Sequence, residues 1–230
     1  KIRELGDSPV IQEFVTGKSV SVEVVGNGKE YQSYLTTEVI LDRNYDCKRV
    51  VCDGSILSEE QDVLFGEIGR KIASEINLHA LMDVEAIVAS KGLRVLEIDA
   101  RVPSQTPAAI EAATGVNILG RLYSSAIGKD FSCRPEDGSS VYCHLVYKDG
   151  ILRTCGEKEF SKVRSPSFGR LFGSDLSISD YSPGSDEWRA TLIFTGNDRK
   201  EAESGFDSAV ERIRDLCIVN GFSDESPEVF

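Results

Sequence analysis

The sequence is short of basic side chains, with 26 Lys and Arg against 38 Asp and Glu and a net charge of −12 at pH 7. Nucleic acids and anionic membranes bind proteins through basic patches, so this balance argues against both as partners. No apolar run reaches the roughly 18 residues that a membrane-spanning helix needs, and no signal peptide is visible. The first residue is Lys1 rather than Met, so we expect a piece of a longer protein.

Motifs that bind metals through cysteine and histidine are also missing. The six cysteines include no CxxC pair and only two histidines accompany them, so no structural zinc site is expected. In a chain of 230 residues such cysteines are typical of reduced thiols, which predicts a cytoplasmic protein. No internal repeat is evident.

The composition is that of a soluble globular protein, with 40% apolar and 28% charged residues. A chain of this length can bury one large core or two small ones. The polar stretch 133–140 is the best candidate for a break, which predicts lobes at residues 1–132 and 133–230. Residues 161–187 are rich in Ser, Gly and Asp, and we expect a functional loop or lid there.

The first half of the chain predicts two strands and a helix. Alternating and β-branched residues indicate strands at 19–26 and 31–41, whereas 43–53 is polar and reads as irregular. Ser58 and Gln61 form a capping box that begins a helix. Apolar residues spaced by four form an apolar stripe along one side of that helix, namely Leu64, Ile68, Ile72 and Ile76.

The second half predicts further helices and strands. Pro107 can begin a helix that ends at Gly115, and Asn117 can cap a helix that ends at Gly128. Asp198 with Glu201 caps a final amphipathic helix. Strands are expected at 141–147, 151–155 and 188–195.

An unusual concentration of acids lies between residues 81 and 101. If 81–89 and 93–101 are strands, alternation places Asp83 and Glu85 on one face. Ser90-Lys91-Gly92 suits a three-residue hairpin loop with glycine in the left-handed region. That turn sets Asp83 opposite Asp99 and Glu85 opposite Glu97.

Two interpretations of this acidic hairpin are open. Like charges directly opposite each other destabilise a sheet by up to about 1 kcal/mol per pair. A solvated face is the plain alternative, although only Arg101 offers compensation. A divalent cation removes the repulsion, and Mg²⁺ favours a few carboxylates plus substrate phosphates. The second interpretation points to phosphoryl chemistry.

The order of these segments resembles the C-terminal part of ATP-grasp ligases. In that family a hydrophobic–acidic linker cradles adenine, and a later hairpin carries acidic metal ligands in a pattern like E…E-x-N-x-R. Here the linker is 11–15 and the pattern is Glu85, Glu97, Asp99 and Arg101, with Asp99 replacing the usual Asn. The resemblance implies an α+β fold, an antiparallel sheet flanked by helices, with a small C-terminal α/β subdomain. The family's upstream nucleotide-fold domain and small phosphate-gripping lobe are absent from these residues.

The resemblance also implies ligands and site residues. ATP would contact Gln12, Glu13, Phe14 and Val15, although this segment could equally be a buried edge strand. Mg²⁺ or Mn²⁺ would be held by Glu85, Glu97 and Asp99. Arg101 would clamp a carboxylate or acyl phosphate in catalysis, or only pair with its neighbouring acids.

Within that superfamily, four segments resemble the ligases of pyrrolysine biosynthesis that join 3-methyl-D-ornithine to the ε-amine of L-lysine. They are SVEVVG at 21–26, YDC at 45–47, MDVEAI at 82–87 and GLRVLEIDARVPSQTP at 92–107. The resemblance implies ATP-dependent activation of a carboxylate to an acyl phosphate, followed by attack of an amine. Alternatives are a lobe that binds Mg²⁺ or a metabolite without turnover, or another ATP-grasp amino-acid ligase. We expect the chain alone to be inactive, and its oligomeric state is not indicated.

Several residues are candidates for amino acid recognition, each with a plain alternative. Asp83 could pair with a substrate ammonium or be a second metal ligand. Tyr45 and Asp46 could recognise a diamino substrate or only shape a turn. The remaining candidates are Ser104 and Thr106, which could bind an anion at a helix N-terminus or only cap the helix, and His144, which could contact substrate or be a hydrogen-bonded core residue.

Overall fold

The computed structural model describes residues 12–228. Its strands are β1 (Lys18–Gly26), β2 (Tyr31–Leu41), β3 (Cys47–Cys52), β4 (Leu81–Ala89), β5 (Gly92–Asp99), β6 (Ser139–Lys148), β7 (Ile151–Thr154), β8 (Ser167–Gly169), β9 (Leu176–Ser179), β10 (Glu187–Gly196) and β11 (Gly221–Ser223). Its helices are α1 (Glu59–Glu75), α2 (Thr106–Thr114), α3 (Ile118–Ala126), α4 (Glu157–Phe160) and α5 (Arg199–Leu216), with a 3₁₀ turn at Leu171–Gly173.

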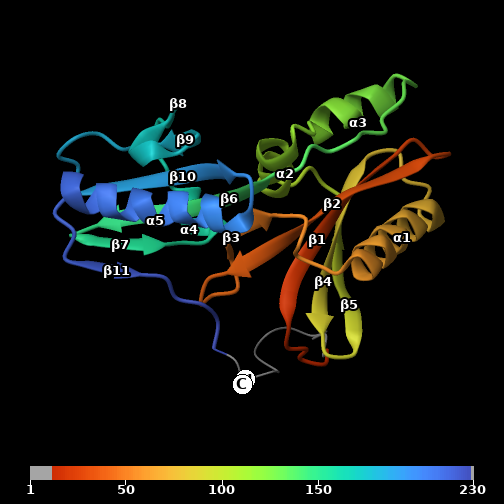
Figure 1. Cartoon of the computed structure of the whole chain (residues 1–230), viewed down its shortest axis with the longest axis horizontal. Coiled ribbons are helices and arrows are strands. Elements are labelled where there is room, and N and C mark those ends of the chain that lie inside the picture. The colour runs from red at the N-terminus through yellow and green to blue at the C-terminus, as the bar shows by residue number, and fades with distance from the viewer. Residues whose placement is uncertain (1–11, 229–230) are drawn as a thin grey trace, which may run out of the picture.

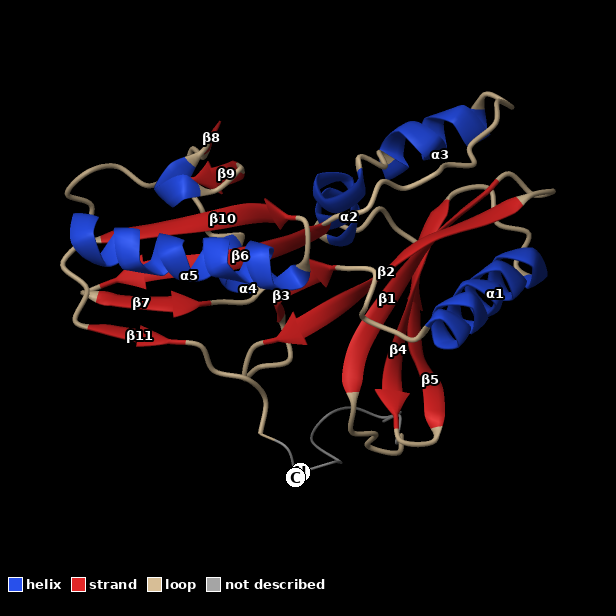
Figure 2. Cartoon of the chain, in the orientation of Figure 1, coloured by secondary structure: helices blue, strands red, loops and turns tan. Residues whose placement is uncertain are grey.

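One sheet connects all the described strands, in the order β5-β4-β1-β2-β3-β6-β10-β9-β8. β7 pairs with β6, and β11 pairs with β7 in the one parallel register among the described strands. Figures 1 and 2 show α1 lying beside the β1–β4 end, α5 lying over the β6–β10 end, and α2 and α3 along the upper side of the view. This antiparallel sheet with flanking helices confirms the predicted α+β class.

Three hydrophobic clusters fill the space between the sheet and its helices. α1 packs Phe65 against Val22 and Val84 on β1 and β4, and α5 packs Phe206 and Ile213 against β6 and β10. The third cluster lies under α2 and α3. β3 pairs with β6, so the sheet runs across the predicted boundary between residues 132 and 133 without a break. The division into two lobes stays a prediction.

Most local signals are confirmed. Ser58 accepts a hydrogen bond from the Gln61 amide in a complete capping box. Gly115 ends α2 with φ of 70°, and Asn117 and Asp198 cap α3 and α5 through their side chains. These signals act within one helical turn, so they do not depend on the rest of the fold.

Two other predictions were wrong. The stretch 43–53 contains the central strand β3, whose valines are buried on both sides by neighbouring elements. Residues 161–187, which the sequence left unassigned, contain β8, β9 and a 3₁₀ turn, and their role as a functional loop or lid stays a prediction. α1 turns Phe65, Gly66, Gly69 and Ala73 to the core, and leaves Leu64 and Ile76 exposed.

The face of α1 is decided by close packing rather than by side-chain size. A Cβ on Gly69 would lie 2.8 Å from a methyl carbon of Val24. Only a small residue lets the helix approach β1 this closely, so the small-residue face replaces the aliphatic stripe. Within the described range, no helix is long and apolar enough to cross a membrane.

A buried lysine holds the C-terminal segment against the sheet. Lys48 is 2% exposed, and its Nζ donates to Asp224 Oδ1 at 2.6 Å, to the Glu225 carbonyl at 2.8 Å and to Ser226 Oγ at 3.2 Å. Asp224 also accepts from Arg49 at 3.1 Å and from Thr154 at 2.7 Å. A fully buried ammonium is stable only with such partners.

We therefore expect Lys48→Met to lower the free energy of unfolding by about 2 kcal/mol, because Asp224 loses its buried partner. Urea denaturation measures this loss, and hydrogen exchange should show faster exchange at residues 221–228. Lys129→Met, at an exposed loop position, is the control and should change neither. Unaltered exchange in the Lys48 variant would mean that other contacts hold the segment.

Candidate active site

The acidic hairpin forms with the predicted pairing. Asp83 lies opposite Asp99, and Glu85 lies opposite Glu97, on β4 and β5. The turn differs from the prediction: Ala89 pairs with Gly92, which leaves a two-residue loop at Ser90 and Lys91. A register shift follows after Glu85, where one extra residue of β5 is accommodated. The shift offsets the shorter loop, so the carboxylates still face each other.

A fifth carboxylate, Glu23, belongs to the same group. β1 pairs with β4 so that Glu23 lies opposite Asp83. The row across β1, β4 and β5 is therefore Glu23, Asp83 and Asp99. Glu23 is 1% exposed and Asp83 is 3% exposed. One oxygen of each, Glu23 Oε2 and Asp83 Oδ1, is buried without a hydrogen-bond partner among the described residues.

The environment of these acids favours protonation. Burial, followed by the negative charge of Asp83, raises the pKa of Glu23 to about 8, although a hydrogen bond from Thr106 opposes the shift. Burial and Asp99 raise the pKa of Asp83 to about 6, and burial with Asp83 and Glu97 raises the pKa of Glu85 to about 7. Uncompensated negative charge is thus concentrated here.

The donor set suits a hard divalent cation, because it consists of several carboxylates, two of which keep an unpaired buried oxygen. Burial and mutual repulsion raise their pKa values, and a bound cation would oppose both effects by supplying positive charge. Within residues 12–228, however, no three such side chains are arranged as a finished metal site. The residue types present fit a magnesium ion chemically.

A cavity of about 820 Å³ opens beside the hairpin. Its size is in the range of about 300–1,000 Å³ typical of small-molecule sites. Gln12, Glu13, Phe14 and Val15 all line it, as do Glu85, Glu97 and Tyr45. The structure therefore brings the predicted linker and two predicted metal ligands to one cavity. The segment 12–15 is not a strand, and Phe14 is 59% exposed, so the alternative of a buried edge strand is wrong for these residues. Ile11, the first residue of the predicted linker, lies outside the described residues.

Arg101 lies next to the acids as predicted. Its guanidinium donates to Asp99 Oδ2 at 2.6 Å, and its side chain is 56% exposed. It therefore pairs with a neighbouring acid while keeping donors available to a ligand. Pairing with a neighbouring acid and binding a carboxylate or acyl phosphate, the two roles that the sequence left open for Arg101, are therefore compatible.

The segment after Arg101 is tied to two other parts of the molecule. Ser104 Oγ donates to Glu157 Oε1 at 2.6 Å, which links it to α4. Thr106 donates to the buried Glu23. Both hydroxyls are thus committed to carboxylates, so neither points to an anion at the start of α2.

Tyr45 and Asp46 are neighbours in the chain but line different cavities. Tyr45 adopts a positive φ of 61° and lines the 820 Å³ cavity. Asp46 Oδ2 accepts a hydrogen bond from the Lys158 amide at 2.8 Å, at the beginning of α4, and lines a second cavity. Asp46 therefore shapes the chain locally and also faces solvent-accessible space.

His144 is a neutral core residue. Gln105 Nε2 lies 2.8 Å from its Nε2, Thr191 Oγ1 lies 2.8 Å from its Nδ1, and the ring of Phe160 stacks on it at 4.4 Å. Burial lowers the pKa of His144 to about 3. The hydrogen-bonded core position that the sequence offered as the alternative is what the structure shows.

The sequence suggested only that Glu23 and Glu38 could line the cleft, and it did not assign Glu23 to the acidic group. Glu23 sits in a β-branched strand, SVSVEVVG, in which a single acid is the only charged side chain after Lys18. An isolated acid in an otherwise buried strand is a signal that could have found it.

Comparison with known proteins gives the same picture. A family model described as ATP-grasp domain matches residues 1–105. The 3-methyl-D-ornithine–L-lysine ligase of Methanosarcina acetivorans is 35% identical over 208 residues, which cover 89% of this chain and 54% of that protein. The Methanosarcina mazei ligase of the same name is 34% identical over 207 residues, covering 89% and 53%. The chain thus spans about half the length of these relatives.

Solved structures share the fold. Biotin carboxylase from Campylobacter jejuni, in complex with β-γ-ATP, superposes with a TM-score of 0.67 at 16% identity, over 87% of this chain and 47% of that one. The biotin carboxylase domain of Hydrogenobacter thermophilus 2-oxoglutarate carboxylase, in complex with MgADP, ADP and bicarbonate, gives 0.63 at 21% identity, over 84% and 45%. Sequence relatives, family model and fold agree, and the chain belongs to the ATP-grasp superfamily.

Proposed function

We propose that this chain is part of an ATP-dependent carboxylate–amine ligase, which joins 3-methyl-D-ornithine to the ε-amine of L-lysine in pyrrolysine biosynthesis. One observation carries the proposal: the opposed pair Glu85 and Glu97 lines a cavity of about 820 Å³ that the predicted adenine linker also lines, and the pair Asp83 and Asp99 follows on the same hairpin. The sequence relatives bear the name of that ligase.

In this proposal the nucleotide occupies the 820 Å³ cavity. Backbone groups of 12–15 would hold adenine, and the exposed ring of Phe14 would pack against it. Lys18 and Arg94 also line the cavity and supply positive charge for phosphates. Glu85, Glu97 and Asp99 would hold Mg²⁺. When bound, that ion would neutralise charge on the phosphates during transfer.

Arg101 would act on the activated carboxylate. Its planar fork can hold two oxygens of a carboxylate or acyl phosphate, and this orients the carbonyl carbon for attack by an amine. Asp83 stays the proposed partner of a substrate ammonium, supported by its unpaired oxygen. The alternative role of Asp83 as a second metal ligand is equally served by that oxygen.

Nucleotide binding tests the proposal directly. Calorimetry should detect binding of ATP that strengthens with Mg²⁺, and Phe14→Ala should weaken it about tenfold by removing an aromatic contact. Phe168→Ala is the control, because Phe168 is also an exposed phenylalanine, at 81%, but lies on β8. Absence of magnesium-dependent ATP binding would contradict the proposal.

A second candidate is a lobe that binds Mg²⁺ or a metabolite without turnover. The observation that favours it is that the chain spans about half the length of its relatives. We expect no phosphate release from ATP with lysine and 3-methylornithine when this chain is assayed alone. Robust turnover would rule out the second candidate.

A further inference from the structure

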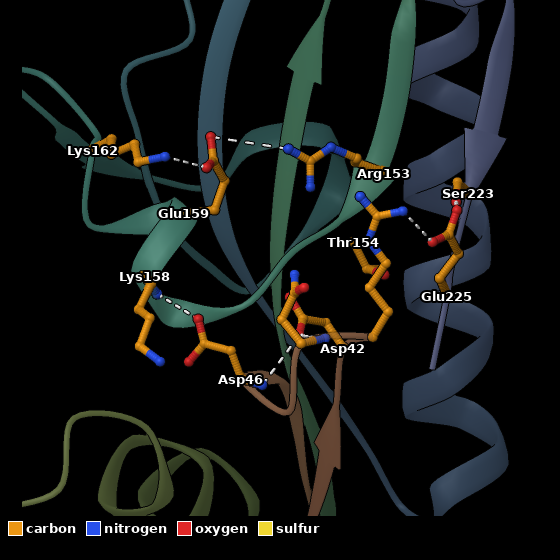
Figure 3. A pocket seen from close by; sticks show the side chains of 11 residues that line it. Asp42, Asp46, Arg153, Thr154, Lys158, Glu159, Lys162, Ser223 and Glu225 are labelled. Carbon is orange, nitrogen blue, oxygen red and sulfur yellow. Dashed lines mark hydrogen bonds and ion pairs between the residues drawn. The ribbon is translucent and has the colours of Figure 1, made fainter. Parts of the chain in front are cut away.

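A second cavity, of about 490 Å³, lies between the loop 42–46, β7, α4 and the C-terminal segment (Figure 3). It shares no lining residue with the larger cavity. The residues around it are unusually rich in both signs of charge. Arg43, Arg153, Lys158 and Lys162 contribute cations, and Asp42, Asp46, Glu159 and Glu225 contribute carboxylates.

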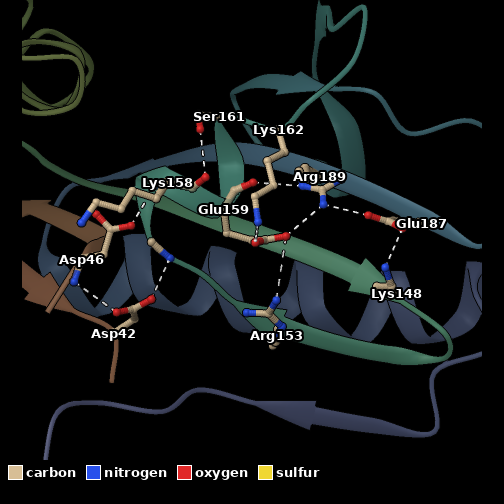
Figure 4. A network of polar contacts seen from close by, with 11 residues as sticks. Asp42, Asp46, Lys148, Arg153, Lys158, Glu159, Ser161, Lys162, Glu187 and Arg189 are labelled. Atoms are coloured by element: carbon tan, nitrogen blue, oxygen red, sulfur yellow. Dashed lines mark hydrogen bonds and ion pairs between the residues drawn. The ribbon is translucent and has the colours of Figure 1, made fainter. Parts of the chain in front are cut away.

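Positive charge is in excess on the α4 side of this cavity. Glu159 accepts from Lys162 at 2.6 Å and from Arg189 at 2.9 Å, and Arg153 approaches it only to 4.0 Å (Figure 4). Arg189 also donates to Glu187 at 2.7 Å, so among the lining residues Arg153 and Lys162 share the single carboxylate of Glu159. The Arg153 side chain is 43% exposed, and the Lys158 ammonium makes no hydrogen bond or ion pair with the residues described. Donors for a further anion are present.

On the side of this cavity formed by Asp42 and Asp46, one carboxylate oxygen accepts no hydrogen bond from the described residues. Both oxygens of Asp42 are occupied, Oδ1 by the amides of Asn44 and Asp46 and Oδ2 by the amide of Gly156. Asp46 uses Oδ2 for the Lys158 amide, whereas its Oδ1 has no partner within residues 12–228. An acceptor for an ammonium thus lies in the same cavity as the donors for an anion.

α4 connects this cavity to the acidic hairpin. Its first residue, Glu157, accepts from Ser104, three residues after Arg101 in the chain. Tyr45, which lines the larger cavity, lies in the chain between Asn44 and Asp46, which line this one. A ligand in the cavity would therefore lie beside the site proposed for ATP.

We propose that the 490 Å³ cavity binds the α-carboxylate and α-ammonium of an amino acid, with Arg153 on the carboxylate and Asp46 on the ammonium. A guanidinium fork matches a carboxylate in geometry, and opposite charges at the two ends of a small cavity select a zwitterion over a simple anion or cation. The inference rests on the proposed function and assigns this cavity to one of its amino acid substrates.

Ligands that lack one charged group test the inference. L-Lysine and D-ornithine are titrated into the chain by calorimetry, beside cadaverine, which lacks the α-carboxylate, and 6-aminohexanoate, which lacks the α-ammonium. At least one amino acid should bind about tenfold more tightly than cadaverine and 6-aminohexanoate. Equal binding of cadaverine, or tighter binding of inorganic phosphate, would overturn the inference.

Variants then assign each end of the ligand. Arg153→Met should lower amino acid affinity about tenfold and leave cadaverine binding unchanged. Asp46→Asn keeps an oxygen for the Lys158 amide, so α4 should be preserved, and it should lower amino acid affinity while leaving 6-aminohexanoate binding unchanged. Arg164→Met and Asp207→Asn, both at exposed positions, are the charge-matched controls. Equal losses in the controls would contradict the assignment.

ATP binding measured on the same samples separates the two proposals. If magnesium-dependent ATP binding is present and no amino acid binds, only the second cavity is misassigned. If ATP does not bind, the proposed function fails, whatever the amino acids do.

Discussion

A triple amide variant, Glu85→Gln with Glu97→Gln and Asp99→Asn, is expected to bind Mn²⁺ at least about 100-fold more weakly than the natural chain. Affinity for a hard cation depends on the number of charged oxygen ligands, and this variant leaves only neutral oxygens at three proposed positions. Mn²⁺ is a convenient paramagnetic probe for a proposed Mg²⁺ site, and water proton relaxation measures its binding.

The same variant should be more stable than the natural chain in the absence of metal. It removes the charge opposition between Asp83 and Asp99 and between Glu85 and Glu97, each of which costs up to about 1 kcal/mol. A gain in stability with a loss of ion binding is typical of a functional site, and a merely structural role of the acids would not produce it.

A control with the same change in net charge uses Glu67→Gln, Glu75→Gln and Asp207→Asn, which are all exposed. It should bind Mn²⁺ as the natural chain does and gain little stability. Undiminished Mn²⁺ binding by the hairpin variant would place the metal elsewhere and remove the main support for the proposed function.

The second large effect is a loss of stability with rising pH. Glu23, Glu85 and Asp83 have pKa values raised to about 8, about 7 and about 6 in the folded chain, so the folded state binds more protons than the unfolded state. Stability is then greatest below the ordinary carboxyl pKa and falls as pH rises through these folded values. For Glu23 alone the loss amounts to about 5 kcal/mol, because its pKa rises from 4.5 to about 8 and each pKa unit corresponds to about 1.4 kcal/mol.

Urea denaturation of the metal-free chain at pH 5 and pH 8.5 measures this loss. Glu23→Gln should reduce the difference in the free energy of unfolding between pH 5 and pH 8.5, because the amide cannot ionise and still accepts the hydrogen bond of Thr106. Glu67→Gln, on the exposed side of α1, should keep the full difference. A pH dependence that Glu23→Gln leaves unchanged would show that Glu23 does not carry the shift.

The acidic hairpin shows which features strand alternation alone can predict. Strand alternation alone places Asp83 and Glu85 on one face, since successive side chains point to opposite sides of a strand. The predicted pairs formed although the predicted turn did not, because the register shift after Glu85 compensates for the shorter loop. The linker was predicted from the resemblance to ATP-grasp ligases rather than from local pattern, and its residues 12–15 line one cavity with Glu85.

The sequence by itself determined the features that depend on a few neighbouring residues: the helix caps at Ser58, Asn117 and Asp198, and the faces of the acidic strands. Only the tertiary structure decided which distant groups meet. Glu23 joins the acidic group because β1 pairs with β4. α1 turns its glycines toward β1 because the helix packs closely on that strand. Asp46 accepts a hydrogen bond from α4, 112 positions away in the chain. Burial and strand order arise from contacts between segments far apart in sequence, and no local periodicity encodes them.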